Sequence, residues 1–106
     1  MSKGIILRPQ VTQDLDDQVA AIAQQNGEAA LDFFDAVRLT IAQLAKMPGM
    51  GAKYSVKNPR LKGLRKWAVK GFRNHIIFYI ERDDAIEIIR ILYATRQISS
   101  ILEREM

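Results

Sequence analysis

Cysteine is absent from this chain, and histidine and tryptophan each occur once. Without cysteine, the chain holds neither a disulfide framework nor a thiolate metal centre. With His75 as the sole histidine, a metal site would need several carboxylates converging on one imidazole, and no such cluster stands out in the sequence. We therefore expect no metal centre and no cofactor.

Long apolar runs are also missing. No stretch approaches the roughly 18 apolar residues that a membrane-spanning helix needs, and the N-terminal apolar run is too short for a signal peptide. We expect a cytoplasmic protein that binds no membrane. The 106 residues, 48% hydrophobic and 26% charged, fit one domain over residues 1–106 with one sizeable core. We therefore look for one functional site.

Acidic residues are missing from the whole middle of the chain, residues 36–80, although the net charge is only +4. Eight cations follow one another closely there, and we call them the cationic segment: Lys53, Lys57, Arg60, Lys62, Arg65, Lys66, Lys70 and Arg73. Such segregation raises the local potential for an anionic partner, either nucleic acid or an acidic protein segment. The alternative is a solvated basic face that keeps the protein soluble.

Hydrophobic periodicity predicts an α+β order of elements. A short strand at residues 4–8 is followed by a helix capped at Thr12, by a second helix over residues 28–46 and by a loop over residues 49–61. Residues 64–96 then alternate as three β-strands broken by turns, and residues 97–106 favour a short helix.

These elements predict a helical hairpin packed on one face of a four-stranded sheet, in which the three C-terminal strands form an antiparallel meander. We take residues 85–94 as the central strand, because both of its alternating faces are mostly apolar.

The second face of this sheet is then predicted to be open and apolar. If Arg90 points away from the helices, strict alternation places Ile77, Tyr79, Ile88 and Leu92 on this face, around the guanidinium of Arg90 and near His75. That is more apolar surface than a small monomer leaves in water, so either the C-terminal segment or a partner protein covers it. Leu39 lies off the apolar stripe of the second helix and marks another contact surface.

Three motifs along the chain, PRLKGLR, W-x-V-x-G-F-x-N and R-I-L-Y-A-x-R, together resemble the RelE/ParE superfamily of toxins from bacterial type II toxin-antitoxin systems. The similarity spans nearly the whole chain and is greatest to the ParE branch. It implies a cognate ParD-like antitoxin whose flexible C-terminal arm wraps the toxin. It also implies that the toxin inhibits DNA gyrase by binding, without chemistry of its own.

Two alternatives remain open. The RelE branch cleaves messenger RNA in the ribosome, commonly with a late Tyr or His, and this chain carries Tyr93 and His75. Beyond Arg96, however, the sequence supplies no Lys, His or Tyr for acid-base work. The other alternative is a non-toxic relative that only binds its antitoxin.

The resemblance also suggests residue roles. We assign no catalytic or metal-binding residue. For Arg90 a structural pairing, with Glu87 or an antitoxin carboxylate, competes with a phosphate contact. The predicted target-binding residues are Arg65, Arg73, Arg90 and Arg96, and the predicted antitoxin-binding residues are Leu39, Ile77, Tyr79, Ile88 and Leu92.

Overall fold

A computed structural model describes residues 2–94 and 97–105. Two short 3-10 turns, η1 (Pro48–Met50) and η2 (Pro59–Leu61), flank a two-residue strand, β2 (Ala52–Lys53), in the loop after the second helix. The elements are β1 (Gly4–Leu7), α1 (Pro9–Ala23), α2 (Gly27–Lys46), η1 (Pro48–Met50), β2 (Ala52–Lys53), η2 (Pro59–Leu61), β3 (Leu64–Val69), β4 (Phe72–Glu81), β5 (Ala85–Tyr93) and α3 (Ile98–Glu103).

The strands form one sheet in the order β1-β5-β4-β3-β2, with β1 parallel to β5 and the other neighbours antiparallel. The α+β class and the meander are confirmed, but the sheet has five strands instead of four. The added strand is β2, whose two residues pair with Lys66 and Arg65. Two residues show no periodicity, so the sequence gives no signal for them. Because β2 extends the sheet on one side, β4 is the middle strand of the five, and β5 is flanked by β1 and β4.

The helical hairpin begins earlier than predicted. Pro9 occupies the first turn of α1, with Arg8 at the N-cap, so Thr12 lies inside the helix. Proline suits this position because its fixed φ is helical and its missing N–H would have no partner there. Asn26 caps α2 by accepting a hydrogen bond from the Ala29 N–H at 3.1 Å.

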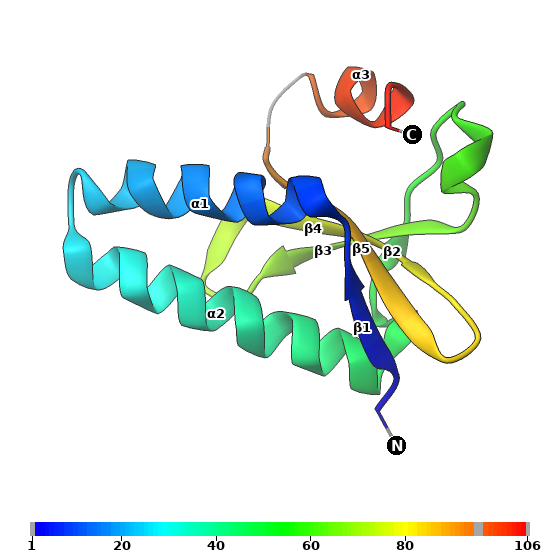
Figure 1. Ribbon diagram of the computed structural model, residues 1–106, viewed down its shortest axis with the longest axis horizontal. Coiled ribbons are helices and arrows are strands. Elements are labelled where there is room, and N and C mark those ends of the chain that lie inside the picture. The colour runs from blue at the N-terminus through cyan, green and yellow to red at the C-terminus, as the bar shows by residue number, and fades with distance from the viewer. Residues whose placement is uncertain (1, 95–96, 106) are drawn as a thin grey trace.

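Each face of the sheet carries its own hydrophobic cluster. Figure 1 shows α1 and α2 as an antiparallel hairpin, with α3 apart from them near the green loop before β3. The cluster on the hairpin face includes Val11, Phe33, Val37, Leu44, Val69, Ile77, Tyr79, Ile86, Ile88 and Ile91. The cluster on the α3 face comprises Leu61, Leu64, Phe78, Ile80, Ile89, Leu92, Ile98 and Leu102.

A β-bulge overturns the predicted open face. Phe78 pairs with Arg90 while Tyr79 pairs with Ile88, so Ile89 is an extra residue on β5. Side chains on either side of an extra residue no longer alternate regularly. The four residues placed together on an open face are therefore divided between the two clusters, and all are at most 6% exposed: Ile77, Tyr79 and Ile88 under the hairpin, and Leu92 under α3.

Helix α3 is tied down by the loop before β3. The Asn58 amide donates to the backbone oxygens of Leu102 and Glu105 at 3.1 and 2.6 Å. The backbone N–H of Lys57 donates to the Glu103 carboxylate at 2.7 Å. The two bonds from Asn58 go to backbone carbonyls at and just beyond the end of α3, where helical partners run out. The predicted C-terminal helix is thus confirmed, and it covers the second face.

Candidate functional site

Arg90 lies at the junction of α1, β5 and the C-terminal segment. Its guanidinium donates twice to the Asp14 carboxylate, each time at 2.7 Å, and once to Glu105 at 3.1 Å. The side chains of Arg90, Asp14 and Glu105 are only 14%, 7% and 14% exposed. The hydrogen bond to Asp14 raises the pKa of Arg90 above its usual value. This arginine is therefore engaged in holding the fold together.

Glu87, the predicted partner of Arg90, pairs with other arginines. Arg8 Nε donates to it at 2.9 Å, and Arg82 donates with Nε and Nη2 at 3.0 and 2.7 Å. Burial alone would raise the pKa of Glu87, but the hydrogen bonds from both arginines outweigh burial and leave that pKa below its usual value. The predicted Arg90–Glu87 pairing is therefore wrong, because the two side chains join separate networks.

The cationic segment has no comparable pairing. Within residues 2–94 and 97–105, none of its eight cations forms an ion pair, while Lys3, Arg8, Arg38, Arg82 and Arg90 all do. Six of the eight are exposed, and Arg65 and Lys66 are half-buried. A positive surface without internal counter-charges attracts anionic partners over the range of a Debye length.

Arg65 is fixed in place by the turn that precedes β2. Its Nη1 donates to the Gly51 carbonyl at 2.7 Å. The Gly51 N–H in turn donates to the Tyr79 hydroxyl at 2.9 Å, and that hydroxyl donates to the Pro48 carbonyl at 2.7 Å. Burial raises the pKa of Tyr79, so the phenol stays neutral and keeps its donor. The turn before β2 thus holds the Arg65 guanidinium in place. The side chain of Arg73, by contrast, is exposed.

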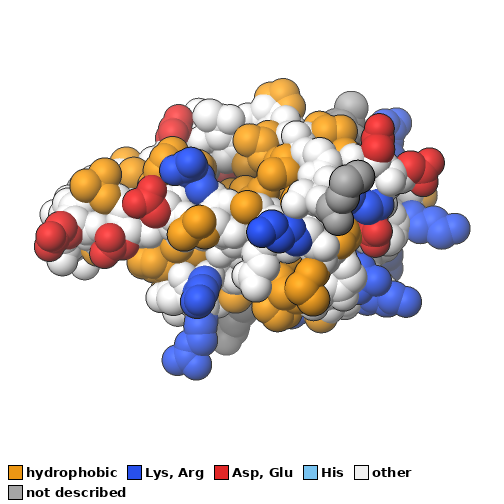
Figure 2. Space-filling view, turned by 90° about the horizontal axis from the view of Figure 1, so that it is seen from below, with side chains coloured by type: hydrophobic (Ala, Val, Ile, Leu, Met, Phe, Trp, Pro, Cys, Tyr) orange, Lys and Arg blue, Asp and Glu red, His pale blue; other side chains and the backbone are white. Residues whose placement is uncertain are grey.

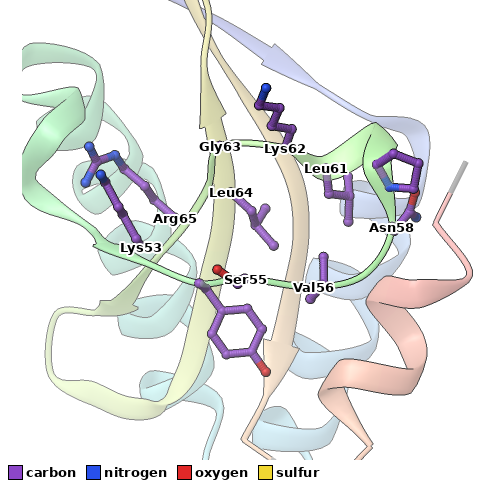
Figure 3. Close-up of a pocket in the computed structure, with 11 residues that line it drawn as sticks. Lys53, Ser55, Val56, Asn58, Leu61, Lys62, Gly63, Leu64 and Arg65 are labelled. Carbon is purple, nitrogen blue, oxygen red and sulfur yellow. The ribbon is translucent and has the colours of Figure 1, made fainter.

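A cavity of about 480 Å³ opens between β2, the loop that follows it and β3. Figure 3 shows its lining residues as sticks, with Lys53 and Arg65 close together on one side. Leu61 and Leu64, each 2% exposed, form its apolar floor. Lys53, Lys62 and Arg65 also line it. Arg65 is paired with Tyr79, so its side chain and that of Lys53 point to the hairpin face, opposite to Leu64. The aliphatic interior of the cavity and the Lys53–Arg65 pair therefore lie on opposite faces of the β2–β3 ribbon.

A second hollow adjoins His75 and Tyr93, which face each other across β4 and β5 with ring centroids 5.0 Å apart. The His75 Nδ1 lies 2.7 Å from the Gln18 amide oxygen, and the Gln18 amide nitrogen donates to the Ile91 carbonyl at 2.8 Å. Gln18 therefore accepts from Nδ1–H, which leaves the Nε2 lone pair available. Burial lowers the pKa of His75, favouring this neutral form. Arg73 lines the same hollow.

The outer surface of α2 carries exposed apolar side chains. Leu31, Phe34 and Leu39 are 68%, 41% and 71% exposed. The predicted exposure of Leu39 is confirmed. Figure 2 views the molecule from below Figure 1, the side of α2, and shows hydrophobic side chains interspersed with charged ones. Such a surface suits a protein partner better than a nucleic acid.

The predicted site residues thus separate into groups. Arg65 and Arg73 belong to the cationic segment, Arg90 is engaged in a buried network, and Arg96 lies outside the described residues. Sequence reasoning missed the pairing role of Asp14, which is 76 residues from Arg90 along the chain, and the contact of Gln18 with His75. Charge segregation indicated the cationic segment, but no sequence signal indicated the cavity.

The described residues also limit the kind of site. Over the described ranges, no three His, Asp or Glu side chains gather as ligands for a metal ion. No described helix has the length and apolar character needed to cross a bilayer.

Comparison with known proteins places the chain among the toxins of type II toxin-antitoxin systems. It belongs to the ParE toxin family, because the family model described as the ParE toxin of the type II toxin-antitoxin system, parDE, matches residues 5–98. A chain from a solved structure of the chromosomal ParDE system of P. aeruginosa is similar in fold. The TM-score is 0.71 at 18% identity, with 89% of this chain and 98% of that chain covered. No curated protein matches.

Proposed function

We propose that this ParE-family toxin is neutralised by a ParD-like antitoxin and that, when free, it poisons DNA gyrase by binding, without catalysis. The observation that carries the proposal is the pattern of charge. Across the described residues, eight cations between positions 53 and 73 form no ion pair. A binding toxin needs an accessible surface of one sign, and its neutralising partner needs to cover that surface.

The antitoxin is supported by family membership and by the exposed apolar side chains of α2. The ParDE system of P. aeruginosa, similar in fold, is itself described as a toxin-antitoxin system. We assign Leu39, together with Leu31 and Phe34, to the antitoxin contact. Ile77, Tyr79, Ile88 and Leu92 are buried within the fold, so the direct antitoxin contact predicted for them is not part of this proposal.

The gyrase target is tested by a supercoiling assay with purified toxin. We expect inhibition of gyrase, with Arg65 and Arg73 at the contact and Arg96 as a further predicted contact. Arg73→Glu should weaken inhibition by about tenfold, because charge reversal in an exposed contact replaces attraction by repulsion. Lys46→Glu on α2, which changes the net charge equally, is the control and should inhibit like the parent. Unimpaired supercoiling under conditions that arrest growth would exclude this target.

A second candidate is ribosome-dependent cleavage of messenger RNA. The specific observation in its favour is the hollow that brings His75, Tyr93 and Arg73 together, with the His75 Nε2 lone pair available. An imidazole held neutral near pH 7 is a competent general base. Mapping transcript ends after induction tests this function: cuts in phase with codons support it, and their absence excludes it.

The third possibility, a non-toxic relative that only binds its antitoxin, is tested by expression alone. If the chain arrests growth when produced without a partner, this possibility is excluded. If growth is unaffected although folded protein accumulates, both toxin mechanisms fail. Restoration of growth by the product of the adjacent gene, copurifying with the chain, would support neutralisation.

A further inference from the structure

The two edges of the sheet differ in charge and polarity. Strand β2, at one edge, carries the exposed Lys53. Strand β1, at the other edge, has the uncharged sequence GIIL, and its side chains Ile5, Ile6 and Leu7 are 46%, 49% and 50% exposed. Natural edge strands are protected from pairing by charges, proline, bulges or short length. Of these devices β1 has only its short length, so it is open to pairing.

The outward backbone groups of β1 belong to Ile5 and Leu7. The N–H groups of Gly4 and Arg8 donate to carbonyls in or next to β5 at 2.9 and 3.2 Å. Because residues along a strand alternate in the direction of their peptide groups, the N–H and C=O of Ile5 and Leu7 point away from β5. Among the described residues, these outward groups have no hydrogen-bond partner. They therefore remain available to another strand.

Apolar surface continues beyond the strand itself. The Lys3 N–H donates to the Ala45 carbonyl at 2.9 Å, which places the end of α2 beside the start of β1 (Figure 1). Met47 follows two residues later and is 59% exposed. A strand that pairs with β1 thus gains apolar contacts as well as backbone hydrogen bonds.

The edge formed by β1 is complementary to itself. If two copies pair antiparallel about a two-fold axis at Ile6, Ile5 of each copy lies opposite Leu7 of the other. Residues whose peptide groups face each other in this way exchange both of their backbone hydrogen bonds. The two Ile6 residues then form the non-hydrogen-bonded pair at the axis, where side chains are closest. A contact of this kind closes after two copies.

The charges near each edge favour a second copy at β1. Lys3 is paired with Glu81 at 3.1 Å and Arg8 with Glu87 at 2.9 Å, so the cations that flank β1 have acidic partners within their own copy. Two β2 edges would instead bring Lys53 against its like. The acidic partner expected for the cationic segment is drawn to that opposite end of the sheet. Edge β1 therefore matches itself best.

We propose that two copies of this protein associate through antiparallel pairing of their β1 strands, which joins two five-stranded sheets into one. The contact is short and mostly apolar. Interfaces of small area are weak, and we expect a Kd of about 10–100 µM. Dimerisation through β1 goes beyond the proposed function and does not depend on the target of the toxin.

The test is sedimentation equilibrium of the full chain at concentrations from about one tenth to ten times the expected Kd. We expect the average mass to rise from that of a monomer towards that of a dimer. Ile6→Lys places like charges against each other at the axis and should weaken association at least about tenfold. Leu31→Lys adds the same charge at a position of α2 that is 68% exposed, and it should dimerise like the parent. Circular dichroism checks that both variants fold.

Cross-linking tests the register of the pair. Since the chain has no cysteine, Ile6→Cys introduces the only thiol. Paired residues at the axis have Cα atoms about 4.5 Å apart, which is within the range of a disulfide. Oxidation should therefore link Ile6→Cys into covalent dimers, and Leu31→Cys should link at least about tenfold more slowly at equal concentration.

Three outcomes would overturn the proposal. The first is a monomer at every concentration, including the case in which the product of the neighbouring gene protects the amides of Ile5 and Leu7 and so occupies the edge itself. The second is a dimer that survives Ile6→Lys. The third is a dimer lost in Leu31→Lys, which would assign the contact to the outer surface of α2. Growth arrest is measured separately, so dimerisation and the proposed function can fail independently.

Discussion

Two regions of this molecule use positive charge in opposite ways. Around β1 and β5, Lys3, Arg8, Arg82 and Arg90 each have an acidic partner close by, as Arg90 has in Asp14 and Glu105. Between β2 and β4, eight cations have no such partner among the described residues. Paired and buried charges contribute to folding, whereas unpaired and exposed charges remain available for binding.

The comparison explains why counting arginines in family motifs is a poor guide to function. Arg90 and Arg73 both lie in motif segments, yet Arg90 is 14% exposed and held by three hydrogen bonds to carboxylates, while Arg73 is exposed. The difference lies in the surroundings of each side chain. It can be tested because the two regions should respond differently to substitution.

The largest expected effect follows from leaving Arg90 without its main partner. Asp14→Ala should lower the free energy of unfolding by about 3 kcal/mol, because a buried guanidinium loses its paired carboxylate. Urea denaturation measures the change. Asp16→Ala, an exposed position on the same helix, is the matched control and should cost less than about 0.5 kcal/mol. A similar cost for both would mean that the pairing does not stabilise the fold.

A smaller loss of folding stability is expected from a substitution at Gly51, in the turn before β2 that packs on the sheet. A Cβ at Gly51 would lie 2.8 Å from Tyr79 Cε1 and 2.9 Å from the Lys66 carbonyl, so Gly51→Ala should destabilise the protein by about 2 kcal/mol. Gly49→Ala meets nothing within 4 Å and should be nearly neutral. Thermal unfolding of the two variants tests this. Equal melting temperatures would show that the contact between the turn and Tyr79 is loose.

The next effect is a pH dependence centred on His75. Burial lowers the pKa of the folded imidazole below 6.5, so the unfolded chain binds a proton first as the pH falls. This contribution to stability should therefore be fully present above about pH 6.5 and decrease as the pH falls below it. His75→Gln should flatten this part of the curve measured by urea denaturation. An unchanged slope in the variant would assign the dependence to another group.

The smallest stability effect is expected in the cationic segment itself. Lys62→Ala should change the free energy of unfolding by less than about 0.5 kcal/mol, since the side chain is exposed and forms no ion pair within the described residues. Binding of an acidic partner should nevertheless weaken. A loss of stability comparable to that of Asp14→Ala would remove the distinction between the two regions.

Periodicity in the sequence predicts most of the fold but only part of the site. The strand, the helical hairpin, the meander and α3 all follow from local patterns, which report local structure. The extra residue Ile89 has no local signature, and it reverses the alternation that placed Ile88 and Leu92 on one face. The pairing of Asp14 with Arg90 joins residues 76 positions apart, so it depends on the tertiary fold.

The segregation of charge, by contrast, can be read directly from the sequence. The absence of acidic residues over positions 36–80 means that any ion pair of the cationic segment must be made with distant parts of the chain or with a partner. Lys53 and Lys62 were predicted only as members of the cationic segment, because their position beside one cavity requires β2 to pair with β3.

The most direct test is amide hydrogen exchange of the toxin, measured alone and in complex with the product of its neighbouring gene. We predict that binding slows exchange over residues 53–65 and along the outer surface of α2, and leaves the junction of Asp14 and Arg90 unchanged. Slower exchange confined to that junction, with residues 53–65 unaffected, would contradict the division of charge on which this account is based.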